Sequence, residues 1–262
     1  MKIVVCIKQV PSSEARVQIN ADGTSIESGE LELVVNPYDE NAVEEALQIK
    51  EAKGGETIAL TVGSDKAEAA LRACLNQGID KAMIVKDPSL QGGDFLGTAK
   101  ILAAALKQIN PDLILLGKLS IDEENSAVGP ALAELLGLPH VAVASKLEWI
   151  DDTSLKVSRE VEGITEILAL SLPAVITANK GLNEPRYASL RGIMAAKKKP
   201  IEAIDPTGLG LDPNVVGAAG RKISILKMEP PPPRAEGKVL QGEPQETVPE
   251  LVRLLREEAK VL

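Results

Sequence analysis

Short apolar runs alternate with longer segments of helical spacing through the first two thirds of the chain. The apolar runs are residues 3–7, 57–62, 81–85 and 113–116. The segments whose apolar side chains recur three and four positions apart are residues 41–53, 65–75, 95–109 and 126–136. This alternation favours a parallel sheet with helices on both faces, because parallel strands are joined by crossovers that usually contain a helix. We therefore expect an α/β fold whose ligands bind at the carboxyl ends of the strands.

The pattern changes after Pro139. Three strand-like segments, residues 146–150, 155–161 and 165–170, follow one another with only short turns between them, which is typical of antiparallel strands. A short apolar run at residues 173–177 then resumes the earlier pattern. We expect one α/β domain over residues 1–205, with antiparallel additions at about residues 145–171.

Residues 206–262 do not continue a compact domain. Glycines loosen the chain after residue 206, and Pro230–Pro233 form a stiff, extended run. An amphipathic segment follows at residues 247–262, and its apolar face carries Val248, Leu251, Leu254 and Leu255. A solitary helix of this length is marginal without a surface to pack on. We expect an arm that packs on another subunit, with a flexible tail as the alternative.

The composition excludes several classes of function. The 262 residues include 38 acidic and 29 basic side chains, one His, two Cys, one Trp, two Tyr and one Phe, and the net charge is −9. Such a chain lacks the basic stripe and the aromatic platforms of nucleic-acid binders. One His and two Cys cannot form a multi-His or Cys-rich metal site, so we expect no metal. No apolar stretch is long enough to span a bilayer, so we expect no membrane insertion.

The cysteines and the amino-terminus indicate a soluble, cytoplasmic protein. Cys6 and Cys74 lie in apolar contexts, so we expect buried thiols and no disulfide. Residues 1–5 run directly into a predicted strand, with no segment that resembles a signal peptide.

Three loops follow apolar runs at the expected ligand-binding edge: residues 6–11, 35–40 and 117–130. The last of them leads into a helix predicted to begin at Asn125 and Ser126, where backbone N–H groups and the helix dipole favour an anion such as a phosphate. This loop lacks the glycine-rich phosphate-binding patterns, so a well-capped helix is the alternative. No combination of Ser, His and acid indicates catalysis, and we interpret His140 as structural.

The most distinctive stretch of the chain is residues 182–200, which we call the docking segment. It combines an aromatic residue, an apolar stripe at helical spacing and a basic run, namely Tyr187; Leu190, Ile193 and Met194; and Lys197, Lys198 and Lys199. One interpretation is a surface helix whose apolar side lies in the core. The other is a docking element in which an exposed Leu anchors the contact and the lysines attract an acidic partner.

Four motifs extend over nearly the whole chain. They are Val5-Cys6-Ile7-Lys8-Gln9-Val10; Asn36-Pro37-Tyr38-Asp39 with residues 42–46; Gly117-Lys118 with Ile121-Asp122; and residues 183–190 (NEPRYASL) with Ile193-Met194 and residues 196–199. Together they resemble the small, beta, subunit of an electron transfer flavoprotein. The last motif is the longest and the most specific. The resemblance implies a Rossmann-like, nucleotide-binding domain followed by an extended C-terminal arm.

The resemblance also implies cofactors and a site. The family forms a heterodimer with a larger alpha subunit, which carries most of the FAD site. The beta subunit holds an AMP of structural role or, in electron-bifurcating members, a second FAD. By motif position, that nucleotide would contact Cys6, Asn36, Pro37, Tyr38, Asp39, Val62, Leu119, Ser120, Ile121, Asp122, Glu123, Glu124, Asn125, Ser126, Ala127, Val128, Gly129 and Pro130.

The implied function is electron relay. The chain would pass electrons from flavin dehydrogenases, such as the acyl-CoA dehydrogenases of fatty acid beta-oxidation, to an electron transfer flavoprotein–quinone oxidoreductase, with no catalytic residue of its own. Tyr38 would lie near the flavin edge, and Leu190 would insert into a pocket of the partner dehydrogenase. The C-terminal arm would embrace the alpha subunit.

Two sequence features indicate which type of family member this chain resembles. Arg191-Gly192 stands where many single-electron-carrying members have Pro-Asn, and Asn36-Pro37-Tyr38-Asp39 resembles the AMP-binding members. We expect AMP. The first alternative is a bifurcating subunit with its own FAD and an NADH site, and the second is a stand-alone adenine-nucleotide sensor or hydrolase.

Overall fold

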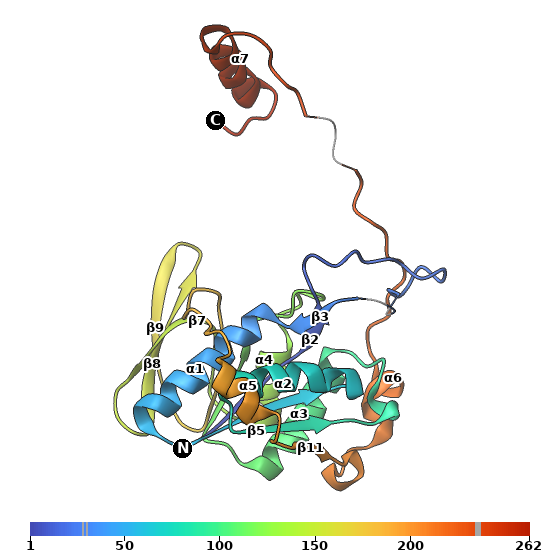
Figure 1. Cartoon of the computed structure of the whole chain (residues 1–262), viewed down its shortest axis with the longest axis vertical. Coiled ribbons are helices and arrows are strands. Elements are labelled where there is room, and N and C mark those ends of the chain that lie inside the picture. The colour runs from blue at the N-terminus through green and yellow to red at the C-terminus, as the bar shows by residue number, and fades with distance from the viewer. Residues whose placement is uncertain (28, 30, 234–236) are drawn as a thin grey trace.

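A computed structural model describes residues 1–27, 29, 31–233 and 237–262. In this part of the chain, strands from distant parts of the sequence join one nine-stranded sheet (Figure 1). Its strands, in spatial order, are β11 (Ile201–Ile204), β5 (Lys81–Val85), β4 (Glu56–Val62), β1 (Lys2–Cys6), β6 (Leu113–Gly117), β10 (Ala174–Ala178), β7 (His140–Trp149), β8 (Ser154–Val161) and β9 (Ile164–Ser171). The strands from β11 to β7 are parallel, and β8 and β9 add to β7 in antiparallel fashion.

Helices cover both faces of this sheet, because successive side chains of each strand point to opposite faces. In β1, Ile3 and Val5 pack under α1 (Pro37–Lys53), α2 (Glu68–Gln77) and the short α5 (Leu190–Ala196). Val4 and Cys6 pack under α3 (Phe95–Ile109) and α4 (Val128–Leu136) on the other face. The expected Rossmann-like α/β architecture, with helices on both faces and antiparallel additions, is confirmed.

The cysteines agree with their prediction. Cys6 and Cys74 are both free and buried. They belong to the clusters on opposite faces of the sheet, so the sheet itself separates the two thiols.

Several predicted boundaries are wrong; α1, for example, begins at Pro37 and not at residue 41. β7 begins at His140, not at residue 146, because its first residues pair in parallel with β10 before the strand continues to β8. α4 begins at Val128, not at residue 126, because Glu124 and Ser126 adopt left-handed backbone conformations with φ of 51°. The last helix, α7 (Pro244–Glu257), starts before residue 247 and ends before residue 262.

The C-terminal part leaves the body in two stages. Residues just after the last strand form 3-10 turns at Pro206–Leu209 and Pro213–Val215 and the short α6 (Gly217–Gly220), and Val216 is buried against the body. The backbone N–H of Lys222 donates to the Asp94 carboxylate at 2.7 Å. An extended stretch then carries α7 away from the body (Figure 1). The division at residue 205 stays a prediction, and the structure adds that the arm separates only beyond Met228, whose N–H donates to the Gly23 carbonyl at 2.7 Å.

A short antiparallel pair, β2 (Gln9–Pro11) and β3 (Leu33–Val35), lies beside the main sheet and leads into α1. No helix among the described residues is long and apolar enough to cross a membrane.

Candidate functional site

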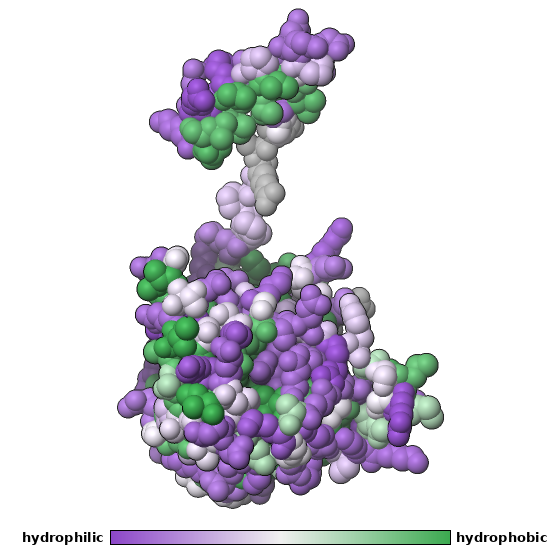
Figure 2. All heavy atoms as spheres, turned by 90° about the vertical axis from the view of Figure 1, so that its left-hand side faces the viewer, coloured by the Kyte–Doolittle hydropathy of each residue, from purple (hydrophilic) through white to green (hydrophobic). Residues whose placement is uncertain are grey.

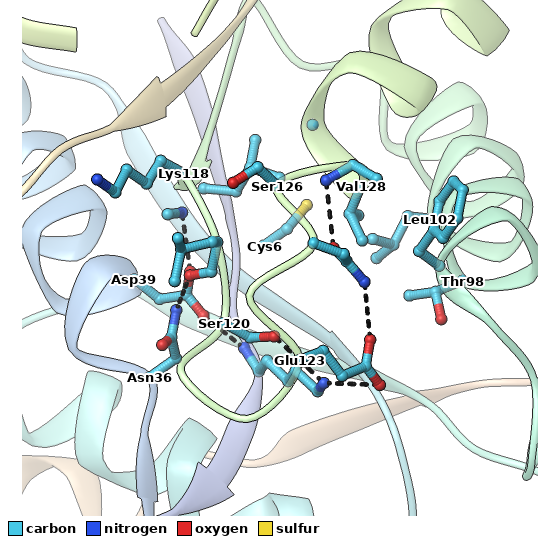
Figure 3. A pocket seen from close by; sticks show the side chains of 18 of the residues that line it. Cys6, Asn36, Asp39, Thr98, Leu102, Lys118, Ser120, Glu123, Ser126 and Val128 are labelled. Carbon is cyan, nitrogen blue, oxygen red and sulfur yellow. Dashed lines mark hydrogen bonds and ion pairs between the residues drawn. The ribbon is translucent and has the colours of Figure 1, made fainter. Parts of the chain in front are cut away.

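A cavity of about 160 Å³ lies at the carboxyl ends of β1, β4 and β6, between the starts of α3 and α4. We call it the inner pocket. Figure 3 shows Asn36 and Asp39 on one side, Thr98 and Leu102 on the opposite side, and Cys6 between them. The sequence-predicted residues that line it are Cys6, Asn36, Asp39, Val62, Leu119, Ser120, Glu123, Asn125, Ser126, Ala127, Val128 and Gly129.

A second, larger hollow of about 1110 Å³ lies on the other side of residues 36–39 and 117–124. We call it the outer cleft. The remaining residues predicted to contact the nucleotide, apart from Pro130, face it: Pro37, Tyr38, Ile121, Asp122 and Glu124. Asn36 with the first turn of α1, and residues 117–124, therefore form a wall whose side chains are divided between two cavities. Pro130, in the first turn of α4, lines neither of them.

Asn36 and Asp39 hold this wall together. The Asn36 side chain donates to the Leu119 carbonyl at 2.8 Å, and its oxygen accepts from the Ile121 N–H at 3.2 Å. The Asp39 carboxylate accepts from the backbone N–H groups of Lys8 at 2.7 Å and Gly117 at 2.8 Å. A Cβ atom at Gly117 would lie 2.5 Å from an Asp39 oxygen, so only glycine fits there.

Asp39 is therefore a structural clamp and not an exposed group at the start of α1. Its side chain is buried, and burial raises the pKa of its carboxyl from 3.8 to about 7, although the hydrogen bonds from Lys8, Gly117 and Asn36 oppose that rise. Burial, with a smaller contribution from Asp39, also raises the pKa of the Cys6 thiol. Cys6 is thus an inert, apolar part of the pocket wall.

The acids before α4 are paired at the rim of the pocket. The Lys8 ammonium lies 2.8 Å from the Asp122 carboxylate and 3.3 Å from that of Glu123. The Asn125 side chain donates to Glu123 at 2.9 Å. The pairing with Lys8 offsets part of the negative charge of these acids.

The start of α4 can accept an anion. Ala127, which caps this helix, makes no side-chain hydrogen bond to its first turn, whereas Asp94 caps α3 by accepting from the Gly97 N–H at 2.9 Å. Pro130 has no N–H, and the Ala127 N–H donates to the Asn125 side chain at 3.2 Å, so the N–H groups of Val128 and Gly129 remain for a ligand. These two groups and the helix dipole favour a phosphate there. The alternative of a well-capped helix does not describe α4.

Several lining residues were not among the predicted site residues. Lys8, Gly93, Asp94, Phe95, Thr98, Leu102 and Lys118 also line the inner pocket. Four of them come from the first turn of α3 or the residues just before it, and Leu102 comes from the middle of that helix. The chain enters α3 from the carboxyl end of β5. The predicted βαβ order could therefore have placed the first turn of α3 at the carboxyl edge of the sheet, beside the pocket.

The docking segment presents apolar side chains to solvent. Tyr187 is 99% exposed, Leu190 83% and Met194 71%, while Ile193 is half-buried and Ala196 faces the core. Among the lysines, Lys197 and Lys198 are exposed, whereas the Lys199 ammonium donates to the Ile79 carbonyl at 2.8 Å and points to the body. The expectation that Lys199 belongs to the docking face is therefore not supported by its contacts.

His140 is half-buried, and its Nε2 atom has no hydrogen-bond partner among the described residues. Burial, and then the charge of Arg159, lower the pKa of its imidazole, so the neutral form is favoured. No cluster of side chains able to hold a metal occurs in the described part of the chain.

Comparison with known proteins gives a consistent result. The electron transfer flavoprotein domain model matches residues 24–209. The chain is 41% identical to the electron transfer flavoprotein subunit beta of Bacillus subtilis, over the whole of both chains. It is also 38% identical to the mitochondrial subunit beta of Oryza sativa subsp. indica, again over the whole of both. It is 35% identical to a probable subunit beta of Saccharomyces cerevisiae, over 98% of this chain and 96% of that one.

Proposed function

The chain belongs to the beta-subunit family of electron transfer flavoproteins, and from this premise we propose that it forms the beta half of a heterodimeric electron carrier. It pairs with an alpha subunit, and their shared FAD accepts electrons from flavin dehydrogenases such as acyl-CoA dehydrogenases. The carrier then passes them to a quinone oxidoreductase. FAD supplies the redox chemistry, and the residues of this chain bind, orient and shield.

We propose that the inner pocket holds AMP. The observation that carries this proposal is the uncapped start of α4, which meets the inner pocket at the carboxyl ends of the strands. The choice of AMP over a second FAD follows the resemblance of Asn36-Pro37-Tyr38-Asp39 to the AMP-binding members. The free N–H groups of α4, with the Ser126 hydroxyl, suit a single phosphate. Cys6, Val62 and Leu116 offer an apolar wall for an adenine ring.

The outer cleft suits the shared FAD. It combines the Tyr38 ring with Pro37 and Ile121 on one wall and lies open to solvent, as a site completed by another subunit requires. The Lys118 ammonium lies 5.0 Å from the centre of the Tyr38 ring. This contact restrains the tyrosine at the wall between the two cavities.

The docking segment is the surface for the partner dehydrogenase. An exposed Leu flanked by exposed Tyr and Met side chains is a compact apolar anchor of the kind that dominates protein–protein contacts. Lys197 and Lys198 beside it attract an acidic partner.

The test of this function is Leu190→Ala in the purified heterodimer with its alpha subunit. We expect electron transfer from an acyl-CoA dehydrogenase to slow by roughly tenfold or more, because the variant loses a buried anchor in the complex. The FAD content should not change. Ile150→Ala is a matched control, because Ile150 is 50% exposed but lies outside the docking segment. A normal transfer rate in Leu190→Ala would contradict the docking role.

A further inference from the structure

The docking segment has little regular structure to hold its shape. Residues 182–189 form neither helix nor strand, and α5 has only 7 residues. Its exposed side chains have few contacts with the body, so burial alone cannot fix them. A fixed arrangement of Tyr187 and Leu190 must come from the polar groups around them.

Arg186, directly before Tyr187, is bound to helix α1 by an ion-pair network. Its guanidinium donates to both oxygens of Glu44, from Nε at 2.7 Å and from Nη2 at 2.9 Å. Its backbone N–H donates to Glu44 at 3.2 Å. The Glu44 side chain is only 5% exposed. Glu51, about two helical turns further along α1, also pairs with the guanidinium.

Further bonds hold the segment on either side of its exposed residues. Asn183 and Asn41 exchange hydrogen bonds between side chain and backbone at 2.9 and 3.0 Å. At the other end, the Arg72 guanidinium donates to the carbonyls of Ala196 at 2.6 Å and Lys199 at 2.8 Å. These contacts bind the front of the segment to α1 and its back to α2.

Gly192 allows the middle of the segment to approach α2. A Cβ atom there would lie 2.4 Å from the Asn76 carbonyl oxygen, which no other residue tolerates without a shift of the backbone. Gly192 is therefore part of how this chain seats α5.

We propose that Arg186 is a positioning residue that, through Glu44, holds Tyr187 and Leu190 in their docking arrangement before any partner binds. This inference rests on the docking role given to the segment above. A segment ordered in advance loses less conformational entropy on association, so the partner binds more tightly without any new contact.

The test uses Arg186→Lys in the heterodimer, because Lys keeps the charge but cannot bind both Glu44 oxygens in the fork geometry. Amide hydrogen exchange is measured over residues 187–199 with no dehydrogenase present. KM and kcat are then measured for reduction by an acyl-CoA dehydrogenase. We expect exchange to accelerate about tenfold and KM for the dehydrogenase to rise about five- to tenfold, since charge-assisted hydrogen bonds are lost. The kcat and the FAD content should stay unchanged.

Glu44→Gln provides a second variant that removes the same pair from the other side. Because the two residues act together, the double variant should be no worse than either single one. Arg16→Lys is the matched control, since Arg16 is exposed and lies outside the docking segment. It should leave both exchange and KM unchanged.

Leu190→Ala separates the two ideas. If the dehydrogenase docks on this segment, Leu190→Ala raises KM for the dehydrogenase without altering amide hydrogen exchange over residues 187–199. If Leu190→Ala leaves KM unchanged, the docking role itself fails. If Leu190→Ala raises KM while Arg186→Lys and Glu44→Gln leave exchange and KM at wild-type values, the positioning role of Arg186 is overturned and the docking role stands.

Discussion

Among single residues, Asp39 and Asn36 have the most specific structural roles. Sequence motifs placed both of them at the nucleotide site, and both line the inner pocket. Their roles as clamps could not be predicted, because their partners Leu119, Ile121 and Gly117 lie about 80 positions away along the chain. The same holds for Arg186, whose partner Glu44 is 142 positions away. Local patterns carry no signal for pairings at such separations.

The raised pKa of Asp39 predicts a pH dependence of stability. Between its ordinary pKa of 3.8 and its folded pKa of about 7, the folded protein keeps a proton that the unfolded chain has lost. The contribution of this group to the free energy of unfolding is therefore fully present below pH 4 and is lost as pH rises through about 7.

Urea unfolding of this subunit from pH 4 to pH 8 measures that contribution against Asp39→Asn, which cannot ionise. The wild type should lose about 4 kcal/mol relative to the variant over this range, on the basis of 1.36 kcal/mol per pKa unit. Parallel pH profiles for the two proteins would show that Asp39 is not buried as described.

At the scale of elements, the period of the apolar residues placed most helices and strands of the first two thirds correctly. It failed where an element depends on a distant partner. The first residues of β7 lie beside β10, and β11 completes the sheet edge beside β5, which is far away in sequence. The start of α4 was misplaced because side chains do not reveal the left-handed backbone of Glu124 and Ser126.

The packing of α4 against the sheet predicts an effect of Gly129→Ala. A Cβ atom at Gly129 would lie 2.4 Å from Cγ2 of Thr177 on β10, so the added methyl group pushes the helix away. We expect a loss of about 1–3 kcal/mol of stability in thermal or urea unfolding, and weaker AMP binding.

Thr177→Ser in the same chain should restore much of this stability, because it removes Cγ2 but keeps the hydroxyl that accepts from Val143. Gly208→Ala is the control, since no atom lies within 4 Å of the added Cβ. If Gly129→Ala were as harmless as Gly208→Ala, the close seating of α4 would be wrong.

At the scale of the whole molecule, the described part of the chain leaves an apolar helix face and a cleft uncovered. Helix α7 has no buried residue, and its apolar side chains gather along one side of the helix (Figure 2). The outer cleft is open. Its walls come from residues 36–39 and 117–124, from the docking segment, and from residues 11–26 near the N-terminus. An uncovered helix face and an open cleft are both explained by an alpha subunit that covers them, and neither is explained by a stand-alone protein.

The central claim is that this chain contributes one small nucleotide site and half of one flavin site. The most direct measurement is the nucleotide released by denaturing the purified heterodimer, separated by chromatography and counted against protein. We predict one FAD and one AMP for each heterodimer. Two FAD and no AMP would contradict it, because the inner pocket would then hold a flavin dinucleotide and the chain would belong to the bifurcating type.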